Sequence, residues 1–430
     1  MRWAAAVAAA VALVGGGAPA AEVVEANLAV VGRSGLAGAG PFDDLAVVGT
    51  TAVVAGHCPG GTVNVVDVKD PRRPSVVAAL PLPPAMRAAE LDAAAVVTPS
   101  FSGDLVAVAL APCGTGTGPA VAYYDVSAVA DPRLLGESPA CAGCPASVSL
   151  AQRADGPALS LRPGPLAGVV VDDVTDPRRP AALGRWSAPE SPSACPRGEV
   201  RSAVLHDDGR GAVVVLTDGR VYQLDLTDPA HPTAAGEEAA PAGRGGYVAA
   251  MPVGARTLAV VADEGPDGAC PATGGPGLRL LELSAGAPQE RDPVRFTTGA
   301  SPGRLVGSGE LAYVAWHGDG LRVVDLGQVR ARAVAQFIPA EAAVVGVGLL
   351  PDHVVVVDRN TGLYVLERPD EAGAASSFWS DLVGLLPYLG FAGILAAAFV
   401  VPRLAMGHAP GRSDVPSPAP ERARAPRPSA

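Results

Sequence analysis

The chain has 430 residues, of which 49% are hydrophobic and only 17% charged, and this composition excludes an intrinsically disordered protein. Glycine (52 residues) and proline (43 residues) are frequent while aromatic residues are scarce, which is typical of many short strands separated by turns. The formal net charge of -11, without a lysine or arginine stripe in the main body, argues against a nucleic-acid-binding protein.

Residues 1–20 have the three parts of a secretory signal peptide. Arg2 supplies the positive charge, Trp3 to Val14 form a short apolar segment, and Ala18-Pro19-Ala20 is a small-residue cleavage site. The apolar segment is short for a bilayer span, which disfavours an uncleaved anchor. We therefore expect the chain to be exported.

A strand motif that ends in an acid recurs along the exported region. Val63 to Pro74 reads VNVVDVKDPRRP, and close copies begin at Val169 (VVVDDVTDPRRP) and at Val221 (VYQLDLTDPAHP). Looser copies bring the number to seven, with the shared acids at Asp67, Asp125, Asp173, Asp225, Glu282, Asp325 and Glu367. Their separations, from 42 to 58 residues, fit the four-stranded blades of a β-propeller.

The shared acids have two interpretations. They can form a ring of functional carboxylates, or each can stabilise the turn after its own third strand. Asp accepts backbone hydrogen bonds in turns, and Pro presets φ and ends a strand. Because the acid recurs together with the Asp-Pro turn, the pattern favours the structural role.

The first strand of the exported region completes the repeat count. From Leu45 onward there are seven sets of the first three strands of a blade but only six clear fourth strands. Leu28 to Ser34 (LAVVGRS) resembles the fourth-strand pattern of Leu134 to Ser138 (LLGES). The sequence thus predicts an all-β, seven-bladed β-propeller over residues 21–370, in which the N-terminal strand closes the last blade and leaves no open sheet edge.

The strand motif followed by Asp-Pro-x-x-Pro resembles the LVIVD-repeat proteins, a family of bacterial and archaeal β-propellers found mostly outside the cytoplasm. The resemblance spans residues 28–368 and is strongest in the copies around Asp67, Asp173 and Asp225. It implies the fold and the location more than an activity. The copies around Glu282 and Glu367 lack the Asp-Pro turn and depart from the family pattern.

All six cysteines are predicted to share one face of the propeller. Second-to-third-strand loops and blade-to-blade connections emerge on the same face, and these segments contain Cys58, Cys113, Cys141, Cys144, Cys195 and Cys270. An even cysteine count in an exported protein predicts disulfides. The blade positions suggest the pairs Cys58–Cys113, Cys141–Cys144 and Cys195–Cys270, while other connectivities and a metal or redox role stay open.

Polar loop residues on this face supply a second hypothesis. His57, His317, Asp263, Asp319 and Asp358 are candidate metal ligands if they converge, and solvated loop residues if they do not. The chain has no H-E-x-x-H, EF-hand or P-loop motif, and no cofactor is expected.

The C-terminal part has the pattern of a membrane anchor. After a linker at 371–381, Leu382 to Val401 is uninterrupted and apolar, matching the ~20 residues that cross a bilayer. Trp379 precedes the span and Arg403 ends it, which together place a transmembrane helix at 382–402. The arginine-rich, proline-rich residues 403–430 are predicted to be a disordered cytoplasmic tail.

These features predict a non-catalytic, membrane-anchored, extracytoplasmic module that binds a protein, glycan or envelope partner through its loops. The alternative is a metal-dependent propeller hydrolase with its site on the loop face near the central channel. Signalling across the membrane is a third possibility, although the short tail contains no recognisable effector domain.

Overall fold

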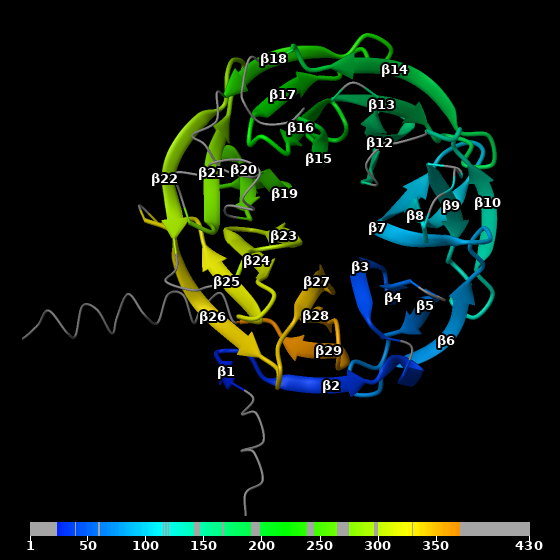
Figure 1. Cartoon of the computed structure of the whole chain (residues 1–430), viewed down its shortest axis with the longest axis vertical. Coiled ribbons are helices and arrows are strands. Elements are labelled where there is room, and N and C mark those ends of the chain that lie inside the picture. Colours follow the sequence, from blue (N-terminus) through cyan, green and yellow to red (C-terminus); the bar gives the residue numbers. More distant parts are fainter. Residues whose placement is uncertain are drawn as a thin grey trace, which may run out of the picture. The chain divides into compact units, whose positions relative to one another are not determined.

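The computed structural model describes residues 24–369, apart from residues 39, 59–60, 115, 117, 119, 142–146, 166, 191–197, 239–244, 265–274, 296–299 and 329. In this part of the chain, 29 strands form seven antiparallel sheets. Figure 1 shows the sheets arranged as blades around a central axis, which confirms the predicted seven-bladed β-propeller. The predicted signal peptide, linker, transmembrane helix and tail lie outside the described residues. No helix within the described ranges is long and apolar enough to span a bilayer.

The first four blades follow the chain in simple order. Blade 1 contains β3 (Phe42–Val48), β4 (Thr51–Gly56), β5 (Val63–Asp67) and β6 (Ser75–Leu80). Blade 2 contains β7 (Met86–Val97), β8 (Ser102–Pro112), β9 (Val121–Asp125) and β10 (Arg133–Glu137). Blade 3 contains β11 (Ser149–Gln152), β12 (Ala158–Gly164), β13 (Gly168–Asp173) and β14 (Ala181–Ser187). Blade 4 contains β15 (Val200–His206), β16 (Gly211–Leu216), β17 (Val221–Asp225) and β18 (Thr233–Glu238).

The last three blades include the N-terminal strands. Blade 5 contains β19 (Gly245–Val253), β20 (Arg256–Asp263), β21 (Gly277–Leu283) and β22 (Gln289–Arg295). Blade 6 contains β23 (Leu305–Ser308), β24 (Leu311–Ala315), β25 (Leu321–Asp325), β26 (Arg332–Ile338) and, at its outer edge, β1 (Val24–Ala26). Blade 7 contains β27 (Val344–Leu349), β28 (His353–Asp358), β29 (Gly362–Glu367) and β2 (Val30–Ser34), and a short 3-10 turn, η1 (Leu36–Gly38), follows β2.

Burial follows the position of a strand within its blade. Every residue of β4 and of β16 is buried, because neighbouring blades cover both sides of the sheet. The valine-rich sequence of these strands is typical of strands buried on both faces. The outer strand β6 instead alternates between more and less exposed positions. The core is therefore a set of apolar layers between adjacent blades, such as the cluster shared by blades 1 and 2.

The N-terminus closes the ring. The strand β2 pairs antiparallel with β29, with Gly32 opposite Val365 and Arg33 opposite Tyr364, which confirms the predicted closure of blade 7. The pairing of β1 with β26 of blade 6 was not predicted. Between the two strands, Asn27 has a positive φ of 57° and its Nδ2 donates to the Val334 carbonyl oxygen at 2.7 Å. The N-terminal segment thus joins blades 6 and 7.

The shared acids stabilise turns, as the repeat pattern suggested. A side-chain oxygen of Asp67 accepts the backbone N–H of Lys69 at 2.8 Å. The same contact to the residue two positions later is made by Asp125, Asp173, Asp225 and Asp325. Glu282 instead forms ion pairs with Arg291 and Arg256. The five aspartates therefore have the structural role rather than forming a functional ring.

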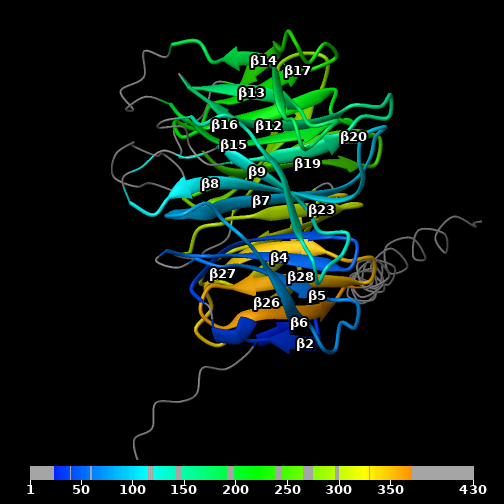
Figure 2. The same ribbon diagram turned by 90° about the vertical axis from the view of Figure 1, so that its right-hand side faces the viewer.

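The strands run across the thickness of the ring, so that their connections emerge on two faces (Figure 2). We call the face with the second-to-third-strand loops and the blade-to-blade connections the loop face; among the described residues it includes 57–58, 61–62, 113–114, 316–320 and 359–361. The opposite face carries the first-to-second and third-to-fourth connections, and we call it the turn face.

Candidate binding face

A disulfide braces the loop face between two blades. Cys58, in the loop after β4, is bonded to Cys113, directly after β8, with Cα atoms 5.7 Å apart. This confirms one predicted pair and ties a loop of blade 1 to the longest hairpin of the propeller, β7–β8 in blade 2. Cys141 is disulfide-bonded as well. Cys144, Cys195 and Cys270 lie outside the described residues, so the other two pairs stay predictions.

Beside this disulfide, three basic side chains converge on Asp43 at the start of β3. The Asp43 Oδ2 atom is 2.6 Å from His57 Nδ1 and 3.3 Å from Arg87 Nη1. The Asp43 Oδ1 atom is 3.1 Å from Arg359 Nη2. These residues come from blades 1, 2 and 7, and we call them the Asp43 cluster.

The backbone holds the Asp43 cluster in place. The N–H of His57 donates to the Pro41 carbonyl oxygen at 2.8 Å, and the N–H of Phe42 donates to the Arg359 carbonyl oxygen at 3.1 Å. His57 also directly precedes the disulfide-bonded Cys58. Two backbone hydrogen bonds and the disulfide thus hold His57 and Arg359 beside the start of β3.

Exposure within the cluster is uneven. The Asp43 side chain is only 9% exposed, whereas those of His57 and Arg359 are each 41% exposed. The carboxylate therefore lies beneath its basic partners. With two guanidinium groups and one carboxylate, the cluster has a net charge of +1 when His57 is neutral, on a chain whose net charge is -11.

Positive charge extends from the Asp43 cluster toward the centre of the ring. Arg201 Nη2 pairs with Glu264 Oε1 at 2.7 Å, and its guanidinium lies 4.4 Å from the centre of the Tyr247 ring. Desolvation lowers the pKa of His317, and the positive charges of Arg359 and Arg201 lower it further, against the opposing effect of Glu264. His317 therefore lies within the electrostatic reach of both arginines.

A further arginine, Arg304, reaches across the centre of the ring. Arg304, just before β23 of blade 6, lies 3.3 Å from Asp44 Oδ2 and 3.4 Å from Glu90 Oε1, both through Nη1. It also donates to the Leu91 carbonyl oxygen. Ser147 Oγ donates to Glu90 Oε1 at 3.0 Å. Blade 6 is thereby linked to blades 1 and 2 through one cation.

Carboxylates outnumber cations around Arg304. Asp44, Glu90 and Asp92 surround it, and burial raises the pKa of all three, although Arg304 opposes that effect. For Glu90 the pKa rises to about 7. A cavity of about 200 Å³ adjoins this group and is lined in part by Ser149, Ser202 and Tyr247. Arg304 and these three carboxylates thus form a buried polar group at the centre of the ring.

The raised pKa of Glu90 predicts a pH-dependent stability. Between the ordinary pKa of 4.5 and the folded value of about 7, the native state binds a proton that the unfolded chain has released, so stability falls as the pH rises through this range. We expect Glu90→Gln to raise the free energy of unfolding by up to about 3 kcal/mol at alkaline pH, with little change near the ordinary pKa. Urea unfolding at alkaline pH and near pH 4.5 measures the difference in stability, with Glu199→Gln at an exposed position as control. An equal gain in stability at both pH values would contradict the raised pKa of Glu90.

The metal-ligand candidates do not form a common site. Asp263 pairs with Arg279 at 3.1 Å, and Asp319 pairs with Arg322 at 3.2 Å. Asp358 accepts the backbone N–H groups of Ala343 (2.6 Å), Asn360 (3.0 Å) and Thr361 (2.9 Å). His57 joins Asp43, and the backbone of His317 is paired with that of Val344. Within the described ranges no three His, Cys, Asp or Glu side chains group as metal ligands.

Sequence reasoning identified His57 but missed its partners. Asp43 and Asp44 form an acidic pair at the start of a first strand, and that pair is the only local signal. Arg87 and Arg359 are far from Asp43 in the chain, and nothing in their own segments marks them. Their convergence depends on ring closure, which brings blade 7 beside blade 1.

Comparison with solved structures finds a likeness of fold and assigns no role. The chain is similar to the crystal structure of Chaetomium thermophilum Raptor, with a TM-score of 0.55 and 11% sequence identity. The match covers 82% of this chain and 29% of that chain, so it shows the fold of one part of a longer protein. No family model matches the sequence, and no curated protein matches it. The chain is a seven-bladed β-propeller.

Proposed function

We propose that this chain is an extracytoplasmic binding module of the LVIVD-repeat type, held at the membrane by residues 382–402, and that its loop face binds an acidic partner. The observation that carries the proposal is the Asp43 cluster, in which three partly exposed basic side chains surround a buried carboxylate.

The chemistry of the cluster favours an anionic group. Guanidinium groups bind carboxylates through parallel hydrogen bonds, and Arg87 and Arg359 each keep donors that Asp43 does not use. When Nδ1 of His57 donates to Asp43, its Nε2 atom is left to meet a ligand. Asp43 fixes the three side chains in one orientation, so less conformational entropy is lost on binding.

The disulfide supports the same function. Because Cys58 follows His57 directly, the bond to Cys113 restrains the loop that carries the imidazole. Rigid scaffolds with positioned loops are commonly used for recognition. A carboxylate-rich protein segment or an acidic glycan has the chemistry that this face would bind.

The test measures the binding of an oligoglutamate peptide to the purified full chain by calorimetry at low salt. We expect Arg87→Glu/Arg359→Glu to weaken binding at least about tenfold, because two attractive contacts become repulsive. The charge-matched control is Arg133→Glu/Arg178→Glu on the turn face, where both side chains are exposed.

An equal loss of binding in both double variants would show a nonspecific charge effect and contradict the proposal. Oligolysine serves as the peptide control and should not bind. No binding of oligoglutamate to the wild-type chain would equally overturn the assignment of an acidic partner.

A further inference from the structure

The first strands of the blades place polar side chains at equivalent positions around the centre of the ring. In blades 1, 2, 4 and 7, the residue opposite the second-strand position four after the partner of the shared acid is Asp44, Glu90, Ser202 and Gly346, respectively. Arg304 takes this position in blade 6, where its carbonyl oxygen accepts the N–H of Ala315 at 2.8 Å. Most members of this inner layer are thus polar.

A cavity of about 200 Å³ lies beside this layer, lined by the first strands of blades 2 to 6. Apolar lining comes from Val148, Ala203 and Val248. The polar side chains of the lining are those of Glu90, Asp92, Ser149, Ser202, Tyr247 and Arg304. A cavity of roughly 150 Å³ accommodates benzene, so this cavity has room for a ring of that size with one polar substituent.

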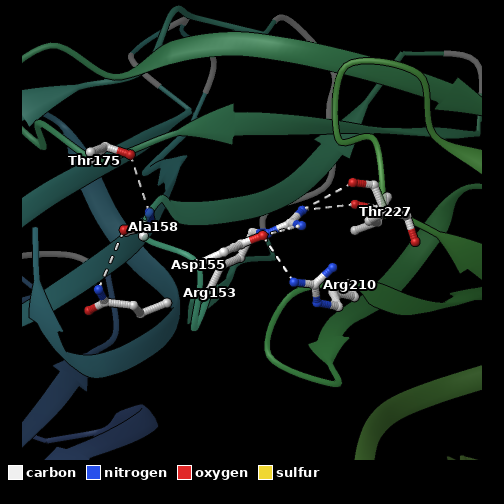
Figure 3. A network of polar contacts seen from close by, with 9 residues as sticks. Arg153, Asp155, Ala158, Thr175, Arg210 and Thr227 are labelled. Carbon is white, nitrogen blue, oxygen red and sulfur yellow. Dashed lines mark hydrogen bonds and ion pairs between the residues drawn. The ribbon is translucent and has the colours of Figure 1, made fainter.

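The wall of the cavity is held between blades 3 and 4. The N–H of Leu205, in β15, donates to Ser149 Oγ, in β11, at 3.1 Å. On the turn face, Asp155 accepts from Arg153 at 2.9 Å and from Arg210, of blade 4, also at 2.9 Å (Figure 3). This part of the wall is therefore preformed, which limits the conformational entropy that is lost when a ligand binds.

One carboxylate oxygen in the wall lacks a donor. Glu90 is only 4% exposed, and its Oε1 atom is bonded to Arg304 and Ser147. The Oε2 atom of Glu90 is buried and has no hydrogen-bond partner among the described residues. A buried acceptor without a donor is costly, so a ligand that donates a hydrogen bond to this atom is favoured.

The charge around Glu90 favours a cation. Arg201 acts on Glu90 as well as Arg304 does, and Arg201 itself pairs with Glu264 at 2.7 Å. Tyr247 is neutral. Two guanidinium groups therefore face four carboxylates, a net charge of -2 when all are ionised: Asp44, Glu90, Asp92 and Glu264. An ammonium group has three N–H donors and no acceptor, which suits both this charge and the unpaired oxygen.

We propose that the cavity binds a small organic cation with one primary ammonium group and an apolar body about the size of benzene. The ammonium group donates to Glu90 Oε2, with the Ser202 hydroxyl as a second acceptor in the same cavity. The body packs against Val148, Ala203 and Val248. The site lies at the centre of the ring and is independent of the acidic partner assigned to the Asp43 cluster.

Binding should strengthen as the pH rises. In the empty cavity, burial raises the pKa of Glu90 to about 7 against the opposing charge of Arg304, so the carboxyl group is protonated below that pH. A primary ammonium group has a pKa near ~10 and stays charged, and on binding it replaces the proton of Glu90, which passes to solvent. The affinity follows the ionised fraction of Glu90, so we expect it to rise about tenfold between about pH 6 and pH 8.

The probe is benzylamine, titrated into the full chain by calorimetry at about pH 8 and about 0.15 M salt. We expect one site per chain, and binding at least about tenfold weaker for benzyl alcohol, which has the same shape without the charge. Glu90→Gln should weaken benzylamine binding at least about tenfold and remove its pH dependence. Because Glu90→Gln is expected to stabilise the fold at this pH, unfolding does not explain such a loss.

Glu199→Gln removes the same charge at an exposed position and should bind benzylamine as the wild type does. Ala249→Leu fills part of the cavity and should also weaken binding, with circular dichroism to establish that the variant is folded. Four results would overturn the proposal: no binding up to roughly 10 mM benzylamine, equal binding of benzyl alcohol, an affinity that does not change with pH, or equal losses in Glu90→Gln and Glu199→Gln.

Discussion

Replacing Arg304 with methionine is expected to lower the free energy of unfolding by about 3–5 kcal/mol at neutral pH. Arg304 is the cation within ion-pair distance of both Asp44 (3.3 Å) and Glu90 (3.4 Å), which are almost fully buried. Without it, two buried carboxylates lose their partner, and the link from blade 6 to blades 1 and 2 is broken. Equilibrium unfolding in urea measures the loss.

Acid should rescue this variant in part. Burial already raises the pKa of Asp44 and Glu90, and both acids are protonated more readily once the cation is absent. The deficit should therefore shrink as the pH falls toward the ordinary carboxyl range. Arg133→Met, whose side chain is 71% exposed, is the matched control and should leave the free energy of unfolding nearly unchanged. A deficit that is the same at all pH values would contradict a charge-based role for Arg304.

Removing the disulfide of the loop face should have an effect of similar size. The bond closes a sequence separation of 55 residues, for which the chain-entropy model gives about 4 kcal/mol of stabilisation. We expect Cys58→Ser/Cys113→Ser to lose that order of stability in urea unfolding, and to bind oligoglutamate more weakly because the His57 loop is less restrained.

Peptide mapping without reductant provides the direct check on this bond. The wild-type digest should contain a linked peptide pair joining Cys58 and Cys113, and no free thiol at either position. Free thiols at both positions in air-prepared protein, or a double variant as stable as the wild type, would contradict the role given to the disulfide.

The propeller could be predicted because its information is local and repeated. The acid at the end of each third strand and the Asp-Pro turn after it recur at blade spacing, so strand order followed from the sequence. The match of Leu28 to Ser34 with other fourth strands similarly revealed the closure with β29. The pairing of β1 with β26 carried no such signature, since Val24 to Ala26 is too short to show a pattern.

The Asp43 cluster and the group around Arg304 could not be predicted, because they depend on distances across the ring. Arg87 and Arg359 are separated from Asp43 by 44 and 316 positions in the chain, yet they contact the same carboxylate. Arg304 reaches blades 1 and 2 from blade 6 for the same reason.

Hydrogen–deuterium exchange of the full chain with and without oligoglutamate tests the central claim most directly. If the Asp43 cluster is the binding site, exchange should slow at the backbone amides around His57, Arg87 and Arg359, and remain unchanged on the turn face. Protection confined to other segments, or no protection anywhere at saturating peptide, would contradict the account.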